Sequence, residues 1–172
     1  MLKIISVAAL VVALSSCNSV ENIVNNTSNS APANMVTPAV NAEKGLITMQ
    51  SSDSLQDTAD KLVEVIESKG MKVFAKVDHQ KNASEANLSL RPTQVIMFGN
   101  PKAGTPLMNC EQTVAIDLPQ KILISEDAQQ RVWLSYNDPF YLKERHNIQG
   151  CDTNIDNISK VLSTTGQEVV AK

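Results

Sequence analysis

The sequence predicts an α+β fold in which helices cover one face of a mainly antiparallel sheet. Several short segments alternate between apolar and polar residues, as half-buried strands do, while other segments repeat apolar residues with the 3.6-residue period of a helix. One strand and one helix are followed by a run of strands and then by helices, which differs from the strict alternation of α/β proteins. These segments fill residues 45–165, about the length of one ordinary domain.

The first half of this domain contains three predicted strands and one long helix. Residues 45–51 form the first strand, and Asp53 with Gln56 resembles a capping box at the start of the helix. The helix ends at Lys69-Gly70, and its buried stripe consists of Leu55, Ala59, Leu62, Val63 and Ile66. The second and third strands are expected in residues 71–77, which end at Asp78-His79, and in residues 93–98.

The second half of the domain is predicted to contain a hairpin and three helices. After a turn at Gly99-Asn100-Pro101, Thr105-Pro106 supplies the cap and the first position of a short helix. The two strands of the hairpin and the two closing helices follow in residues 118–125, 131–136, 139–146 and 152–165. Residues 166–172 are expected to form a flexible tail.

The first 16 residues have the features of an export signal. Lys3 precedes an apolar run from Ile4 to Leu14, which is shorter than the roughly 20 residues that a membrane-spanning helix needs. Leu14-Ser15-Ser16-Cys17 resembles the bacterial lipobox, in which the cysteine sulfur receives a diacylglycerol before cleavage. We therefore expect a signal peptide over residues 1–16 and a mature chain that begins with acylated, palmitate-bearing Cys17.

The position of Asn18 bears on where such a lipoprotein would reside. An aspartate after the acylated cysteine usually retains lipoproteins at the inner membrane, and this chain has asparagine there. We expect a lipid-anchored protein of the cell envelope that faces the periplasm from the outer membrane. Residues 17–44 are rich in Asn, Ser, Thr, Ala and Pro, have no aromatic residue, and are predicted to be a disordered tether.

Composition excludes several kinds of partner. The formal net charge is −3 and Lys and Arg do not cluster, so nucleic acid is not an expected partner.

Residues 99–105 have the two glycines of a phosphate loop but lack the Lys-Ser/Thr pair, and a strand-to-helix turn is the simpler interpretation. Its backbone amides could still hold an anion. Because no cofactor motif is present, we expect no cofactor.

Two cysteines remain once Cys17 carries lipid. Cys110 and Cys151 form an even pair in an oxidising compartment, which predicts a disulfide between the middle of the domain and the start of its last helix. The alternative is two buried free thiols.

Candidate site residues are polar side chains at strand ends and in loops. A ligand cleft is predicted to contain His79, Asn100, Asp117, Lys121 and Tyr136. An enzyme that uses Asp78, His79 and Asp117 as acid–base groups is one alternative, although no nucleophile is evident. Handling of copper or zinc is another, with His79, His146, Met97, Met108 and Cys110 as soft ligands, but these residues lack the usual spacing and we expect no metal site.

Several short blocks in order resemble the family named domain of unknown function 302. They are Asp78-His79, Leu90-Arg91-Pro92-Thr93, Met97-Phe98-Gly99-Asn100-Pro101, Gly104-Thr105-Pro106-Leu107-Met108, Ile116-Asp117-Leu118-Pro119 and Trp133-Leu134-Ser135-Tyr136-Asn137. The resemblance covers residues 45–147 and implies a TATA-box-binding-protein-like α+β fold of strand, helix, antiparallel strands and helix. It also implies a tendency to form homodimers, and it implies no activity. Cys110 and the region of Cys151 depart from the family pattern, which fits an added disulfide.

Together these features predict a non-enzymatic, membrane-anchored envelope lipoprotein. Its single domain is expected to bind a small ligand or another protein, to form a homodimer, and to contact the membrane through its lipid.

Overall fold

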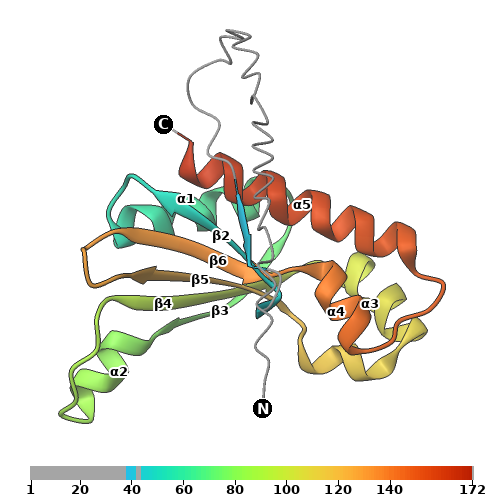
Figure 1. Ribbon diagram of the computed structural model, residues 1–172, viewed down its shortest axis with the longest axis horizontal. Coiled ribbons are helices and arrows are strands. Elements are labelled where there is room, and N and C mark those ends of the chain that lie inside the picture. The colour runs from blue at the N-terminus through green and yellow to red at the C-terminus, as the bar shows by residue number, and fades with distance from the viewer. Residues whose placement is uncertain (1–37, 42–43, 172) are drawn as a thin grey trace, which may run out of the picture. The chain divides into compact units, whose positions relative to one another are not determined.

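The computed structural model describes residues 38–41 and 44–171. Its centre is a six-stranded antiparallel sheet with the strand order β1-β2-β6-β5-β4-β3 (Figure 1). The strands are β1 (Ala39–Asn41), β2 (Leu46–Ser51), β3 (Lys72–Asp78), β4 (Thr93–Gly99), β5 (Gln120–Glu126) and β6 (Val132–Asn137). The predicted signal peptide, Cys17 and most of the predicted tether lie outside the described residues.

The helices cover one face of this sheet and its ends. They are α1 (Leu55–Ser68), α2 (His79–Glu85), α3 (Pro101–Cys110), the 3-10 helix η2 (Gln112–Ile116), α4 (Pro139–Arg145) and α5 (Asp152–Val170). Helices α1 and α5 pack against each other, α1 contacts β3, β4 and β5, and α5 contacts β2. Figure 1 shows α2 at one end of the strands and α3 and α4 at the other. The predicted α+β architecture with one covered sheet face is confirmed.

The core lies between the sheet and the pair α1 and α5. Strands contribute alternate side chains to it, so that Ile122 and Ile124 of β5 are fully buried while Leu123 between them is half-buried on the opposite face. Buried apolar side chains of α1 and α5 meet this layer, and each such residue contributes about 1.5–3 kcal/mol relative to an exposed one.

Two helix starts differ from the sequence prediction. The cap of α1 is Ser54, whose hydroxyl accepts a hydrogen bond from the backbone N–H of Asp57 at 3.1 Å, one residue beyond the predicted Asp53 pair. Helix α3 begins at Pro101 because Asn100 caps it, accepting from the N–H of Lys102 at 2.9 Å. The predicted start at Thr105-Pro106 is therefore wrong, and Pro106 lies inside the helix.

Helix α2 and β1 were not predicted. No residue of α2 is buried, so the segment has no apolar periodicity that could reveal a helix. Strand β1 lies inside the predicted tether and pairs with β2 over residues 46–48, which makes the tether prediction wrong for residues 39–41.

The predicted tail is also wrong for residues 166–170, which continue α5. Val169 and Val170 are buried in the core. A Gly near a helix end usually marks its termination, but a Cβ on Gly166 would lie 3.0 Å from Sδ of Met49. The glycine is therefore needed where α5 approaches β2.

Candidate functional site

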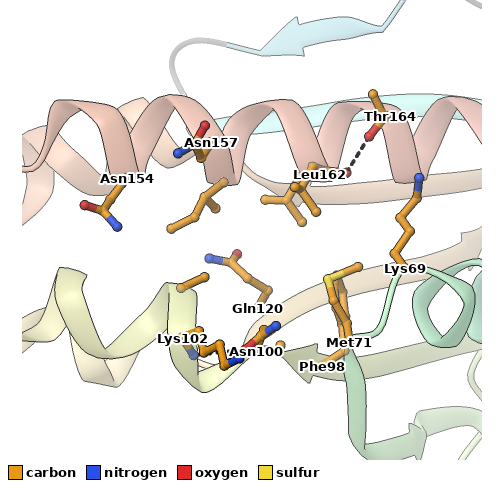
Figure 2. Close-up of a pocket in the computed structure, with 14 residues that line it drawn as sticks. Lys69, Met71, Phe98, Asn100, Lys102, Gln120, Asn154, Asn157, Leu162 and Thr164 are labelled. Atoms are coloured by element: carbon orange, nitrogen blue, oxygen red, sulfur yellow. Dashed lines mark hydrogen bonds between the residues drawn. The ribbon is translucent and has the colours of Figure 1, made fainter.

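The main cleft lies between α3 and α5, above the adjoining ends of β3, β4 and β5. It consists of two adjoining hollows with volumes of about 600 Å³ and 290 Å³. The hollows share five lining residues, which makes them one continuous half-open groove: Gly99, Asn100, Ala103, Gln120 and Ile158. We call this groove the α3–α5 cleft. Figure 2 shows its larger hollow, with α5 on one side and α3 and the strand ends on the other.

The floor of the larger hollow is apolar. It contains the side chains of Met71, Phe98, Ile158, Val161 and Leu162. Phe98 and Leu162 belong to the domain core, whereas Val161 is 39% exposed on the surface of α5. Apolar clefts of this size, lined by a few polar groups, are the common form of small-molecule binding sites.

Four side-chain amides line the larger hollow, and they belong to Gln120, Asn154, Asn100 and the exposed Asn157 of α5. Gln120 lies on the same face of β5 as Ile122 and Ile124, because residues two apart share a face, and it therefore points toward the helices (Figure 2). Asn154 projects from the first turn of α5 into the groove (Figure 2). Gln120 and Asn154 are both half-buried, and neither side chain has a hydrogen-bond partner among the described residues. Asn100, the cap of α3, is the third.

The charged residues that line the cleft are two lysines. Lys69 at the end of α1 pairs with Glu168 of α5, with Nζ 2.7 Å from Oε1. Lys102 in the first turn of α3 is exposed and has no ion-pair partner within the described part of the chain. Within the part of the chain that the structure describes, no aspartate or glutamate lines either hollow. The cleft is thus locally basic in a protein whose net charge is negative.

A disulfide joins the two helices that flank the cleft. Cys110 is the last residue of α3 and Cys151 directly precedes α5, and the structure contains the predicted bond between them. Because α3 and α5 form opposite walls of the groove, this bond fixes one end of both walls.

The structure does not bring the five predicted site residues together. Asn100 lines the cleft, but His79 is exposed at the start of α2. Asp78 pairs with Gln94 at the beginning of β4, whereas the cleft lies at its other end, where Phe98 pairs with Gln120. A site combining His79 with Asn100 is therefore excluded by the sheet register.

Lys121 and Tyr136 have structural roles in the domain. The ammonium group of Lys121 donates to the backbone carbonyls of Asp117 and Pro119, at 2.8 Å and 3.0 Å. Burial lowers the pKa of Lys121, and the charge of Asp117 opposes that change. Tyr136 is 2% exposed, and burial together with the charge of Asp138 raises its pKa to about 12, so it stays neutral at physiological pH.

Asp117 pairs with the other histidine of the chain. Its Oδ2 lies 2.6 Å from Nε2 of His146, and Nδ1 of His146 lies 3.0 Å from Oγ1 of Thr113. The hydroxyl of Thr113 also donates to Glu111 at 2.8 Å, and Arg145 approaches Asp117 at 3.4 Å. Hydrogen bonds from the backbone N–H of Thr113 and from its hydroxyl lower the pKa of Glu111. The contacts of His146 connect η2 to the end of α4. The network contains no residue that lines the cleft.

The proposed acid–base and metal groups are likewise separated. Asp78 and His79 lie at the end of the sheet remote from Asp117, so they do not form one catalytic group with it. Cys110 is bonded to Cys151 and has no free thiolate for a metal. Within residues 38–41 and 44–171, no three His, Cys, Asp or Glu side chains are grouped as metal ligands would be.

Sequence reasoning missed Gln120, Asn154 and Lys102. A signal for Gln120 was present, because it occupies the buried face of a strand whose next two residues on that face are Ile122 and Ile124. No comparable signal marks Asn154 or Lys102, which are polar residues in the first turns of two helices that meet only in the folded chain.

The fold and the cleft define an α+β domain with a half-open groove between its helices and one end of its sheet. The chain belongs to the family described as Domain of unknown function DUF302, whose model matches residues 47–165 of the 172. The predicted family resemblance is thereby confirmed.

A solved structure agrees with this membership. The crystal structure of an uncharacterized conserved protein DUF302 from Bacillus stearothermophilus is similar to this chain with a TM-score of 0.67 and 18% identity, covering 73% of this chain and 98% of that one. At 18% identity this similarity is evidence for the fold alone, and it confirms the predicted α+β fold.

The curated relatives are fluoride-specific ion channels. FluC 1 of Brucella suis biovar 1 (strain 1330) is 43% identical over 106 residues, which are 62% of this chain and 42% of that protein. FluC 1 of Brucella abortus biovar 1 (strain 9-941) and FluC 2 of Brucella melitensis biotype 1 are also 43% identical, over 39% of their length. This chain thus spans about two fifths of the relatives it matches. In the described part of this chain, no helix is both long enough and apolar enough to cross a bilayer.

Proposed function

We propose that this protein is an envelope lipoprotein whose DUF302 domain binds a small, largely apolar ligand in the α3–α5 cleft. The observation that carries this proposal is the pair Gln120 and Asn154, two half-buried amides without a hydrogen-bond partner in the described chain, above an apolar floor. Water can reach both amides in the half-open groove, and a ligand that enters the groove can replace that water as their hydrogen-bond partner. The domain acts by binding rather than by catalysis.

The lipid anchor is the second part of the proposal. A basic residue, a short apolar run and the lipobox-like Leu14-Ser15-Ser16-Cys17 support cleavage before Cys17 and acylation there. Asn18 supports residence in the outer membrane, facing the periplasm. Residues between Cys17 and the domain would then hold the cleft away from the membrane surface.

Ligand binding is tested by NMR on the chain from residue 18 onward, with ¹⁵N-labelled side-chain amides. A panel of small apolar and amphiphilic molecules is added, and ligands of the cleft shift the amide signals of Gln120 and Asn154. The exposed amide of Gln129 in the β5–β6 turn serves as the internal control. If the ligands shift the signal of Gln129 as much as the signals of Gln120 and Asn154, the proposed site is contradicted.

The anchor is tested by intact-mass measurement of the protein from the membrane fraction. Loss of residues 1–16 and added acyl mass on Cys17 is the expected result. A Cys17→Ser variant should be recovered as unacylated precursor. An unacylated wild-type chain contradicts the lipoprotein proposal without affecting the ligand proposal.

A role connected with fluoride is a second candidate, favoured by the names of the Brucella relatives. In this case the domain would act beside a fluoride-specific ion channel. Cells lacking the protein should then be more sensitive to sodium fluoride than the parent, and equally sensitive to sodium chloride. Equal sensitivity of both strains to fluoride contradicts this role.

A further inference from the structure

We infer that the ligand of the α3–α5 cleft is a single-chain amphiphilic carboxylate, with its head group at Lys102 and its chain running along α3 toward Leu118. This inference rests on the proposed ligand-binding function and names the chemical class of the ligand. It follows from the charge, the hydrogen-bond donors and the shape of the cleft.

The charge of the lining selects an anion. Among the described residues, the charged ones that line the two hollows are Lys69 and Lys102. Lys69 is engaged with Glu168, while Lys102 has no ion pair within the described ranges. A cationic head group would be repelled by Lys102, whereas an anionic one gains a charge-assisted hydrogen bond from it.

The amides beside Lys102 add donors for such an anion. The side-chain oxygen of Asn100 accepts the N–H of Lys102, at 2.9 Å, which leaves the NH₂ group of Asn100 to donate elsewhere. Gln120 and Asn154 also line this hollow and present further donors (Figure 2). The oxygens of a carboxylate accept several hydrogen bonds at once, and this is the group that the donors can satisfy together.

The shape of the cleft selects a chain. The smaller hollow continues from the larger one along α3, and none of the described residues that line it is charged. Its lining includes Phe74, Met108, Leu118 and Pro119. Lys72 lies near its mouth, but its ammonium group is engaged over the ring of Phe74, 5.6 Å from the centroid. An apolar tail therefore fits the smaller hollow, and the head group belongs at the other end.

Titration calorimetry on the chain from residue 18 onward tests this class with ligands that share one tail. The series is decanoate, decanol, decyltrimethylammonium and decyl phosphate, all below their aggregation concentrations. We expect decanoate to bind about tenfold more tightly than decanol, because a hydrogen bond to a charged group is worth more than one to a neutral group. Decyltrimethylammonium should bind more weakly than decanol.

Three variants locate the head group. Lys102→Gln should weaken decanoate about fivefold and leave decanol unchanged, while Lys72→Gln, with the same loss of charge at the other mouth, should change neither. Val161→Asp places a carboxylate in the lining at an exposed helix position, so it should weaken decanoate at least about tenfold and favour the cationic ligand. Circular dichroism checks that each variant is folded.

The outcomes separate this inference from the proposal on which it rests. Equal affinity for decanoate and decanol would contradict a carboxylate ligand. An effect of Lys72→Gln that matches that of Lys102→Gln would contradict the proposed orientation of the ligand. Neither result would contradict ligand binding in the cleft. Decyl phosphate binding about tenfold more tightly than decanoate would assign the site to a phosphate amphiphile instead. If no member of the series binds and the NMR panel also leaves Gln120 and Asn154 unshifted, the ligand-binding function itself fails.

Discussion

Oδ2 of Asp117 and Nε2 of His146 lie 2.6 Å apart, and both side chains are almost completely buried, at 12% and 7% exposed. This contact joins η2 to the residue that follows α4, across 29 positions of sequence. It holds together the segment that carries Cys110 at one end and leads to Cys151 at the other.

Replacing His146 should therefore destabilise the domain. His146→Ala removes the shortest hydrogen bond to the Asp117 carboxylate and leaves Arg145 and Lys121 as the cations near it, which should cost about 2–3 kcal/mol of the free energy of unfolding. Urea unfolding at pH 7 measures this. His79→Ala is the matched control, because His79 is exposed and should change stability by less than about 0.5 kcal/mol. Equal effects of the two substitutions would contradict the structural role of the Asp117–His146 contact.

Asp127 gives the β5–β6 turn a pH-dependent stability. Partial burial alone would raise the pKa of Asp127, but hydrogen bonds from Trp133, Arg131 and Gln129 hold it well below its usual value. Because the folded-state pKa is depressed, the stabilisation is present above the unfolded pKa of about 4 and is lost as the pH falls through lower values.

Asp127→Asn should therefore lower the urea midpoint at pH 7, and the difference from wild type should shrink as the pH falls below about 4. Unfolding curves between pH 7 and pH 2.5 measure this. A difference that is constant over this range would show that the lost hydrogen bonds, and not the ionised carboxylate, account for the effect.

Tyr136 tests whether a predicted site residue belongs to the core. Its buried hydroxyl has no hydrogen-bond geometry to any described residue, although the nearby Ser163 acts to lower its pKa. Tyr136→Phe removes a poorly satisfied polar atom, so the free energy of unfolding should change by less than about 0.5 kcal/mol or rise. Decanoate affinity should be unchanged. A loss of affinity without a loss of stability would return Tyr136 to the ligand site.

The disulfide should matter for both stability and binding. Removing it by Cys110→Ser with Cys151→Ser should cost about 3–4 kcal/mol, the loop-entropy expectation for a separation of 41 residues. Ligand affinity should fall as well, because the bond fixes the ends of α3 and α5. Calorimetry on the folded double variant, with dithiothreitol-treated wild type as the comparison, measures this. Unchanged affinity would show that packing alone determines the shape of the cleft.

The sheet face opposite the helices is where we expect a homodimer to form. Val77, Val95 and Leu123 lie in register across β3, β4 and β5 on that face. Leu123→Glu should shift the protein to monomer in sedimentation velocity, whereas Leu88→Glu, at an exposed loop leucine, should not. A monomeric wild type at high concentration would contradict the dimer.

The sequence predicted the elements whose side chains alternate between core and solvent. The strands at residues 93–98 and 131–136 and the helix with Leu62 and Ile66 were recognised because burial on one face imposes a period on the residues. Helix α2 has no buried face and so no period. The last helix was predicted to end at residue 165, but it continues through Gly166, where the missing side chain allows close packing against Met49. The pairing of Cys110 with Cys151 followed from counting cysteines, which needs no geometry.

By itself the sequence determined the fold class, the family, the disulfide and the expectation of a lipid anchor, because these depend on patterns within single segments or on residue counts. Only the tertiary structure decided which polar residues share a site. Asn100, Gln120 and Asn154 come from three elements that meet at one end of the sheet, while His79 lies at the other end. Proximity of this kind is set by strand register and by the packing of α3 against α5, and neither can be read from the spacing of residues along the chain.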